Sequence, residues 1–144
     1  MNVEAILRRK GDEVATIAPG VSIAAAAAEM RRQGIGSLVV SRDGAMVDGI
    51  ISERDIVQGL AALGARLLDS KVDELMTRRV FTCTPQDNVA DLAAEMTQRR
   101  IRHIPVLRDG MLGGIVSIGD VVKARLDEMQ DETTSLRSFI AGAS

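Results

Sequence analysis

The stretch that decides the fold is GIISERDIV at residues 49–57, which returns as GIVSIGDVV at residues 114–122. Both stretches follow the pattern Gly-Ile-x-Ser-x-x-Asp, in which a short apolar run leads directly into the expected start of a helix. The similarity continues upstream, where the Ala-Ala-Glu-Met of residues 27–30 recurs at residues 93–96. The chain therefore contains two copies of one supersecondary unit.

Each copy predicts the same order of elements. A β-branched run (residues 14–17 and 80–82) ends near a proline, which favours the end of a strand, and a helical pattern follows (23–33 and 89–99) with Ser22 and Asn88 as N-caps. Two more strands flank an Arg-Asp-Gly turn, at 37–41 and 49–52 and again at 103–107 and 113–117. A second helix then begins at Ser-x-x-Asp, and Gly64 is expected to end the first of these helices. The unit is β-α-β-β-α, and it occurs twice.

Composition limits the architecture and the class of ligand. Two halves of about 65 residues would each be marginal alone, so they are expected to share a core. Apolar residues make up 46% of the 144-residue chain and aromatic residues only 1%, which disfavours a base-stacking surface for RNA. A formal net charge of −2 means that the chain has no excess of positive charge to attract nucleic acid or an anionic membrane. A small diffusible ligand or a protein partner fits better.

Cysteine content and the N-terminal sequence bear on metal sites and compartment. The single cysteine, Cys83, excludes an internal disulfide and leaves no zinc or iron–sulfur cluster, so it is expected to be a small core residue. The first residues lack a secretory signal pattern, and no apolar run approaches the length of a membrane span. We expect a cytoplasmic protein without a metal site.

Each Ser-x-x-Asp motif has two interpretations. A serine N-cap with an acidic residue three positions later is close to a capping box, which is purely structural. The same motif places Ser52 with Asp55, and Ser117 with Asp120, where a strand feeds a helix N-terminus, a common ligand position in α/β units. Arg54 is a cation in a first helical turn, which the helix dipole disfavours. It is either fully solvated or placed there for a bound negative group.

The chain resembles the tandem cystathionine-β-synthase (CBS) domain pair from about Val3 to Leu126. The motifs that carry the resemblance are Met76-Thr77, the run Arg-His-Ile-Pro-Val at residues 102–106, and the duplicated Gly-Ile-x-Ser-x-x-Asp. The resemblance implies a mixed α/β (α+β) fold of two β-α-β-β-α CBS repeats packed with pseudo-twofold symmetry, here with an extended C-terminal helix. We assign residues 1–65 to the first repeat, 71–128 to the second, and 129–144 to a helical tail.

The resemblance also implies two symmetry-related clefts that bind adenosine compounds such as AMP, ADP, ATP, NAD or S-adenosylmethionine. In each cleft the aspartate would accept hydrogen bonds from the ribose hydroxyls, which suits a carboxylate, and the serine would orient the sugar or phosphate. The cleft of Asp120 is expected to contain Ser117, Ala15, Thr16, Ile35, Gly36, Arg102 and His103. The cleft of Asp55 is expected to contain Ser52, Arg54, Thr77, Phe81, Thr82 and Ile101.

Phosphate contacts are expected to differ between the clefts. Arg102 and His103 can neutralise phosphate charge beside Asp120, whereas the equivalent positions beside Asp55 are Gly36 and Ser37. Considered alone, His103 beside Ile104-Pro105 is expected to be a partly buried, hydrogen-bonded residue. The adjacent Arg102, with Ser117 and Asp120 on the next strand, favours a ligand role instead.

The C-terminal stretch from Ala124 to Ser144 is the most charged part of the chain. It is expected to be either a solvated helix or a helix whose apolar stripe binds a partner chain. The stripe would consist of Leu126, Met129, Leu136, Phe139 and Ile140.

The sequence thus predicts a regulatory module rather than an enzyme, with an adenine nucleotide (AMP first, NAD as an alternative) as its ligand. It is expected to sense energy state, to form a homodimer and to modulate a separate protein. An NAD(H) redox sensor and a ligand-free dimerisation scaffold are the competing hypotheses. No glycine-rich phosphate loop of the Walker or Rossmann type is present, and no catalytic residue is assigned.

Overall fold

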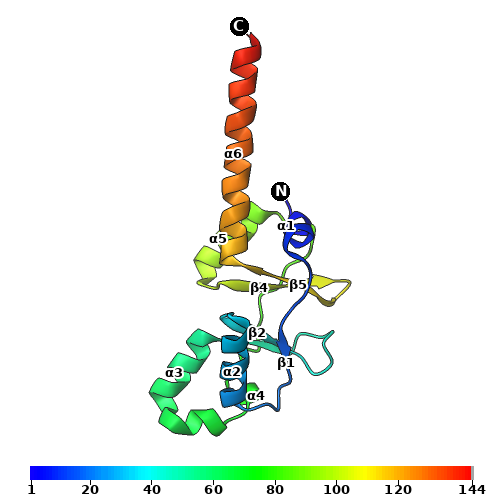
Figure 1. Cartoon of the computed structure of the whole chain (residues 1–144). Coiled ribbons are helices and arrows are strands. Elements are labelled where there is room, and N and C mark those ends of the chain that lie inside the picture. The colour runs from blue at the N-terminus through cyan, green and yellow to red at the C-terminus, as the bar shows by residue number, and fades with distance from the viewer. Residues whose placement is uncertain (144) are drawn as a thin grey trace.

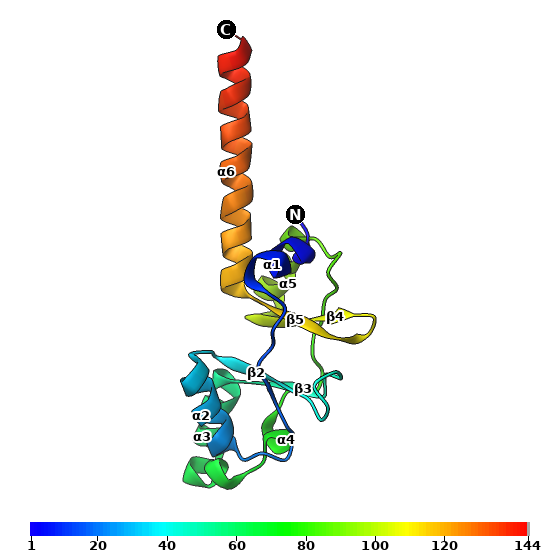
Figure 2. The same cartoon turned by 45° about the vertical axis from the view of Figure 1, so that its right-hand side comes forward.

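The computed structural model describes residues 1–143, so Ser144 of the predicted tail lies outside the described residues. Two lobes face each other through their sheets, with the helices on the outer sides (Figures 1 and 2). The first lobe contains α2 (Ile23–Gln33), β1 (Thr16–Ile17), β2 (Ser37–Val40), β3 (Gly49–Ser52), α3 (Glu53–Leu63), a 3₁₀ segment (Gly64–Asp69) and α4 (Val72–Leu75). The second contains α1 (Val3–Lys10), α5 (Val89–Arg99), β4 (His103–Arg108), β5 (Met111–Ser117) and α6 (Ile118–Ala143). The predicted mixed fold of two repeats with an extended C-terminal helix is confirmed.

Local sequence signals determine where the helices begin and end. The side chain of Ser22 accepts from the Ala25 N–H, and that of Asn88 accepts from the N–H groups of Ala90 and Asp91. Both predicted N-caps are therefore confirmed, because each satisfies donors that the first helical turn leaves free. Gly64 ends α3 with a positive φ of 64°, also as expected.

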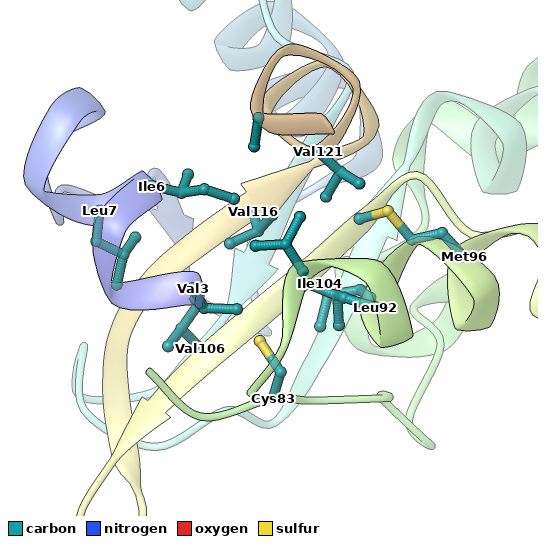
Figure 3. Close-up of a cluster of buried hydrophobic side chains, with 12 residues drawn as sticks. Val3, Ile6, Leu7, Cys83, Leu92, Met96, Ile104, Val106, Val116 and Val121 are labelled. Atoms are coloured by element: carbon teal, nitrogen blue, oxygen red, sulfur yellow. The ribbon is translucent and has the colours of Figure 1, made fainter. Parts of the chain in front are cut away.

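The short helices at the start of each repeat are exchanged between the lobes. Val3, Ile6 and Leu7 of α1 pack into the core of the second lobe, against α5, β4, β5 and the start of α6 (Figure 3). Reciprocally, Val72 and Met76 from the start of the second repeat pack into the core of the first lobe. Each lobe is thus completed by a segment from the other repeat, which is how two marginal halves become one module.

This exchange explains the glycine that begins each copy of the duplicated motif. A Cβ at Gly114 would come within 2.8 Å of the Leu7 side chain, and a Cβ at Gly49 would lie 2.7 Å from the Met76 sulfur. Leu7 and Met76 are the equivalent residues of the exchanged helices. Glycine is needed at both positions because a helix crosses the strand there at close range.

The predicted strand at residues 80–82 does not form. In the first lobe, the N–H of Val39 donates to the Ala15 carbonyl at 3.1 Å and holds β1 parallel to β2. The residue equivalent to Val39 is Pro105, which has no N–H to donate. Cys83 alone makes a bridge to β4, through the Cys83 N–H to the Pro105 carbonyl at 3.0 Å and the Leu107 N–H to the Cys83 carbonyl at 2.8 Å. Residues 80–82 therefore belong to no strand.

Cys83 itself is the core residue that the sequence predicted. It is 3% exposed and packs with the apolar side chains of the second lobe. Burial raises the pKa of its thiol to about 12.

Candidate functional site

A cavity of about 1200 Å³ lies between the two repeats. In the first lobe its walls come from α2, the loop between α2 and β2, β3 and α3. In the second lobe they come from the segment around residues 79–81 and the loop between α5 and β4. We call it the inter-repeat cavity, lined by Ala27, Met30, Arg31, Gly34, Ile35, Gly36, Ile50, Ser52, Glu53, Arg54, Asp55, Ile56, Val57, Gln58, Thr77, Arg79, Val80, Phe81, Arg100, Ile101, Arg102 and His103. It is large enough for a mononucleotide or a dinucleotide.

Asp55 is held at the wall of this cavity by the capping box of α3. Its Oδ2 accepts from the Ser52 N–H at 2.9 Å and from the Ser52 hydroxyl at 3.1 Å, while the Asp55 N–H donates to Ser52 Oγ. The other oxygen, Oδ1, has the Thr77 hydroxyl at 3.5 Å. The cap therefore fixes the carboxylate through one oxygen and leaves the second in a weak contact, so it can accept hydroxyl groups from a ligand.

Arg54 crosses the edge of the cavity to the second lobe. Its Nη1 donates to the carbonyl of Arg100 at 3.1 Å, and Arg100 is the residue that ends α5. A cation at a helix C-terminus is favourable, which accounts for the arginine that the dipole of its own helix disfavours.

Arg100 occupies a backbone conformation that glycine normally takes. Its φ is 55°, in the left-handed region, and the equivalent residue of the first repeat is Gly34 with a φ of 66°. A side chain in this region costs about 1 kcal/mol. Residues in this region are enriched at functional sites, and Arg100 lines the inter-repeat cavity.

Positive charge dominates the lining. Five arginines face two carboxylates, those of Glu53 and Asp55. The arginines are Arg31, Arg54, Arg79, Arg100 and Arg102. A guanidinium group binds a phosphate through paired hydrogen bonds, so the cavity combines a hydroxyl acceptor with a cationic wall.

Apolar side chains form another part of the wall. Ile35, Phe81 and Ile101 line the cavity together. The guanidinium of Arg99 lies over the Phe81 ring, 4.4 Å from its centroid, in a cation–π contact. A flat apolar group such as a purine can pack against this surface.

His103 lies between the two motifs. It lines the inter-repeat cavity and pairs with Ser117 in the β4–β5 register. Burial, followed by the positive charges of Lys10 and Arg102, holds the pKa of His103 below its usual value. The imidazole is therefore neutral near pH 7 and can take up a proton when an anion binds beside it.

Asp120 has different surroundings from Asp55, although its cap is the same. Its Oδ2 accepts from the Ser117 N–H at 2.8 Å, and the Asp120 N–H donates to Ser117 Oγ at 3.2 Å. The same Oδ2 also accepts from Lys10 Nζ at 2.7 Å, and Lys10 binds the Ile115 carbonyl at 3.0 Å. Burial would raise the pKa of Asp120, but Lys10, the Ser117 N–H and the Ser117 hydroxyl together hold it below its usual value.

The structure brings together ten of the residues that the sequence nominated. Ser52, Arg54, Asp55, Thr77, Phe81, Ile101, Ile35, Gly36, Arg102 and His103 share the inter-repeat cavity. The last four were expected beside Asp120. Within residues 1–143, the other five nominated residues, Ala15, Thr16, Thr82, Ser117 and Asp120, lie outside this lining.

Sequence reasoning missed Arg31, Arg79, Arg100 and Lys10. Arg100 could have been found from the repeat alignment, because it replaces the glycine that ends the equivalent helix. Lys10 gave no such signal, since the extra turn of α1 has no counterpart in the second repeat.

Comparisons with known proteins identify the family of the chain. The CBS domain family matches residues 3–62 and 72–127. The CBS domain-containing protein CBSX3, mitochondrial, of Arabidopsis thaliana is 38% identical over 117 residues, which are 78% of this chain and 57% of that protein. The chain thus spans little more than half of that relative's length.

Solved structures give the same result. The CBS-domain containing protein ATU1752 from Agrobacterium tumefaciens superposes with a TM-score of 0.84 at 43% identity, covering 87% of this chain and 99% of that one. The CBS domain pair of protein MJ0100, solved in complex with 5′-methylthioadenosine and S-adenosyl-L-methionine, superposes with a TM-score of 0.75 at 26% identity, covering 89% and 98%. Among residues 1–143, no helix combines the length and apolarity needed to cross a membrane.

Proposed function

The chain belongs to the CBS-domain family, and on that premise we propose that it binds an adenine nucleotide in the inter-repeat cavity and thereby regulates another protein. The observation that carries the proposal is the lining of the cavity, in which the Asp55 carboxylate, with one oxygen only weakly engaged by Thr77, is joined by five arginines. A ribose and a phosphate are the two groups that this combination recognises together. The ligands named for the MJ0100 domain pair both contain adenosine.

The residues have separate roles in this proposal. Asp55 accepts from the ribose hydroxyls, and Ser52 holds that carboxylate in place. The adenine packs against Ile35, Phe81 and Ile101, while Arg54, Arg100, Arg102 and His103 contact the phosphate. AMP, ADP or ATP is the first choice of ligand, and the size of the cavity also admits NAD.

We propose that the Asp120 cleft is closed to ligands in this state. Lys10 already neutralises Asp120, so a ribose there would have to displace a hydrogen-bonded ammonium group. Ala15 and Thr16, at β1, and Thr82, in the segment before Cys83, then have structural roles only. One module would bind one nucleotide, with Lys10 as the residue that decides the number of sites.

Regulation follows from the position of the cavity between the lobes. A ligand that touches both lobes stabilises one relative arrangement, provided that it binds the two arrangements with unequal affinity. The module has a regulatory rather than a catalytic role in this proposal, and the regulated protein is a separate chain. We propose the cytoplasm as its compartment.

A thermal-shift panel tests the proposal. The full chain is heated with AMP, ADP, ATP, NAD⁺, NADH and S-adenosylmethionine, with adenosine and GMP as controls for the phosphate and the base. A ligand at about 100 times its Kd adds about 2.7 kcal/mol of apparent stability, which is a shift of several degrees. We expect AMP to exceed both adenosine and GMP. Absence of a shift with every adenine compound would refute nucleotide sensing and favour the scaffold.

A further inference from the structure

The C-terminal helix carries an apolar seam that its own lobe leaves uncovered. The seam runs through Val122, Leu126, Met129, Thr133, Leu136 and Ile140, at alternating intervals of four and three residues. This is the spacing of the a and d positions of a coiled coil. Every residue from 129 to 142 is exposed, and α6 projects far beyond both lobes (Figures 1 and 2).

The seam faces away from the body of the molecule. Val121 and Ala124 are buried at 1% and 3% exposure and attach the start of α6 to the second lobe. Asp127 pairs with Arg9, and Glu128 pairs with the N-terminal amine at 3.4 Å, on the same side. At 100° per residue, Val122 and Leu126 lie on a different side of the helix. They are 49% and 56% exposed, so the seam is accessible to a second chain.

The identities of the seam residues suit a two-stranded coil. Thr133 and Ile140 are β-branched residues at a, and Leu136 occupies d, which is the combination that favours two parallel strands. The Thr133 hydroxyl donates to the Met129 carbonyl at 2.9 Å. Burial of Thr133 in a seam would therefore leave no unsatisfied hydroxyl.

The charges that flank the seam select the orientation. With Leu126 at a, Glu132 takes position g and Arg137 takes the e position of the next heptad. In a parallel pair these two residues face each other across the interface, twice by symmetry, with opposite charges. In a fully overlapped antiparallel pair, Glu132 would face Glu132 of the second copy, and Lys123 would face Arg137. Both antiparallel contacts repel.

We propose that α6 forms a parallel two-stranded coiled coil with α6 of a second copy of this chain. The two-fold axis of the pair runs along the seam, so the interface is isologous and closed. Acidic residues at Asp127, Asp131 and Glu132 disfavour an anionic lipid surface as the occupant. A helix that projects without packing is marginal in water, and pairing supplies the burial that stabilises it.

Disulfide trapping in the full-length protein tests the orientation. In a parallel pair the two copies of residue 136 meet in one d layer, at a separation that a disulfide can span. We expect Leu136→Cys to form a covalent dimer under mild oxidation at least tenfold faster than Ser138→Cys, which sits at the outer f position. Wild-type protein is the control for Cys83, which is buried.

Two trapping results would overturn the proposal. Failure of Leu136→Cys to exceed Ser138→Cys excludes the parallel pair. Preferential coupling of Leu126→Cys with Leu136→Cys in a mixture would show an antiparallel pair instead.

Charge reversal provides a second measurement on the same interface. Glu132→Arg places like charges across the parallel seam and is expected to raise the dimer Kd by roughly threefold to tenfold in sedimentation equilibrium. Glu132→Arg with Arg137→Glu restores opposite charges and should return the Kd to the wild-type value. Equal weakening in the single and double variants would contradict the pairing. Nucleotide binding is unaffected in either case, which separates this test from that of the cavity.

Discussion

The two Ser-x-x-Asp motifs have the same cap and opposite environments. The N–H that follows each serine donates to an equivalent carbonyl, Glu53 to Gly36 at 3.0 Å and Ile118 to Arg102 at 2.8 Å. Asp55 nevertheless lines a large cavity beside a neutral threonine, whereas Asp120 is bound by Lys10. The motif therefore fixes where the carboxylate sits, and residues outside it, on or next to the exchanged helices, determine which partners that carboxylate already has.

The copies also differ in the backbone around the motif. The first has Val39 and Gly34 where the second has Pro105 and Arg100. Pro105 removes a strand, and Arg100 introduces a strained backbone at the cavity wall. Of these two differences, only the one at Arg100 lies beside the proposed ligand, because Pro105 is outside the lining of the cavity.

The largest expected effect comes from giving the first copy the proline of the second. Val39→Pro removes the N–H that pairs the central strand β2 with the Ala15 carbonyl, and we expect a loss of about 3 kcal/mol in the free energy of unfolding. The reciprocal change, Pro105→Val, should alter this free energy by less than about 1 kcal/mol. Urea denaturation of both variants measures the difference. Similar losses in the two copies would show that Pro105 is not the reason the second strand is missing.

Substitution of the two aspartates tests whether the sites are unequal. Asp55→Asn keeps the shape but removes the charge that strengthens bonds to the ribose, so the affinity for AMP should fall by roughly tenfold to a hundredfold. Asp120→Asn should change it by less than about threefold, because Lys10 already occupies that carboxylate. Isothermal titration calorimetry gives both values. Equal losses would mean that the two clefts are equivalent.

Lys10→Met should make the second site resemble the first. Without the ammonium group, Asp120 keeps its cap but loses the partner at 2.7 Å. We expect the calorimetric stoichiometry with AMP to rise from one toward two, with the new site the weaker. The pKa of Asp120 should also rise, because burial, which raises it, is then opposed only by the hydrogen bonds from Ser117. Lys71→Met, at an exposed position away from the residues that surround Asp120, is the matched control, and an unchanged stoichiometry in Lys10→Met would exclude Lys10 as the residue that closes the cleft.

The sequence predicted most of the fold because its signals are local. Ser22 and Asn88 fix helix starts, and the helices at 23–33 and 89–99 have the expected bounds. The strand expected at 80–82 does not form, because its pairing would need a backbone N–H at position 105, on another segment. That position is Pro105, which has no N–H. Exchange of the short helices was not predicted either. A repeat alignment compares equivalent residues and carries no information about which lobe a segment completes.

The site was predictable in its residue types but not in its grouping. Arg102 and His103 lie at the start of β4 of the second repeat, yet they line the cavity of Asp55 because the lobes face each other through their sheets. Lys10 binds the other carboxylate from a helix whose extra turn has no counterpart. Both facts depend on packing between repeats. The ligand roles of all these residues stay predictions.

Arg100→Gly should separate stability from binding. Glycine relieves the left-handed backbone that Gly34 adopts freely in the other copy, so the free energy of unfolding should rise by about 0.5 kcal/mol. Loss of one guanidinium from the cavity should weaken AMP binding several-fold. The Arg54 bond survives because it uses the backbone carbonyl. Chemical denaturation and calorimetry on one preparation provide both quantities, and a variant with unchanged affinity would show that the strain has no role in binding.

The smallest expected effect is a pH dependence that only the Asp55 side should show. Burial and the charges of Lys10 and Arg102 hold the pKa of His103 below 6.5 in the free protein, and a bound phosphate would raise it. Binding then takes up a proton, so the affinity gains as pH falls from about 7.5 toward the depressed pKa. AMP itself gains a proton near pH 6, so the informative quantity is the ratio of wild-type affinity to that of His103→Gln at each pH. We expect this ratio to increase by a few-fold toward low pH. A ratio that stays flat would place the phosphate away from His103 and leave the arginines as its only cationic contacts within the described cavity.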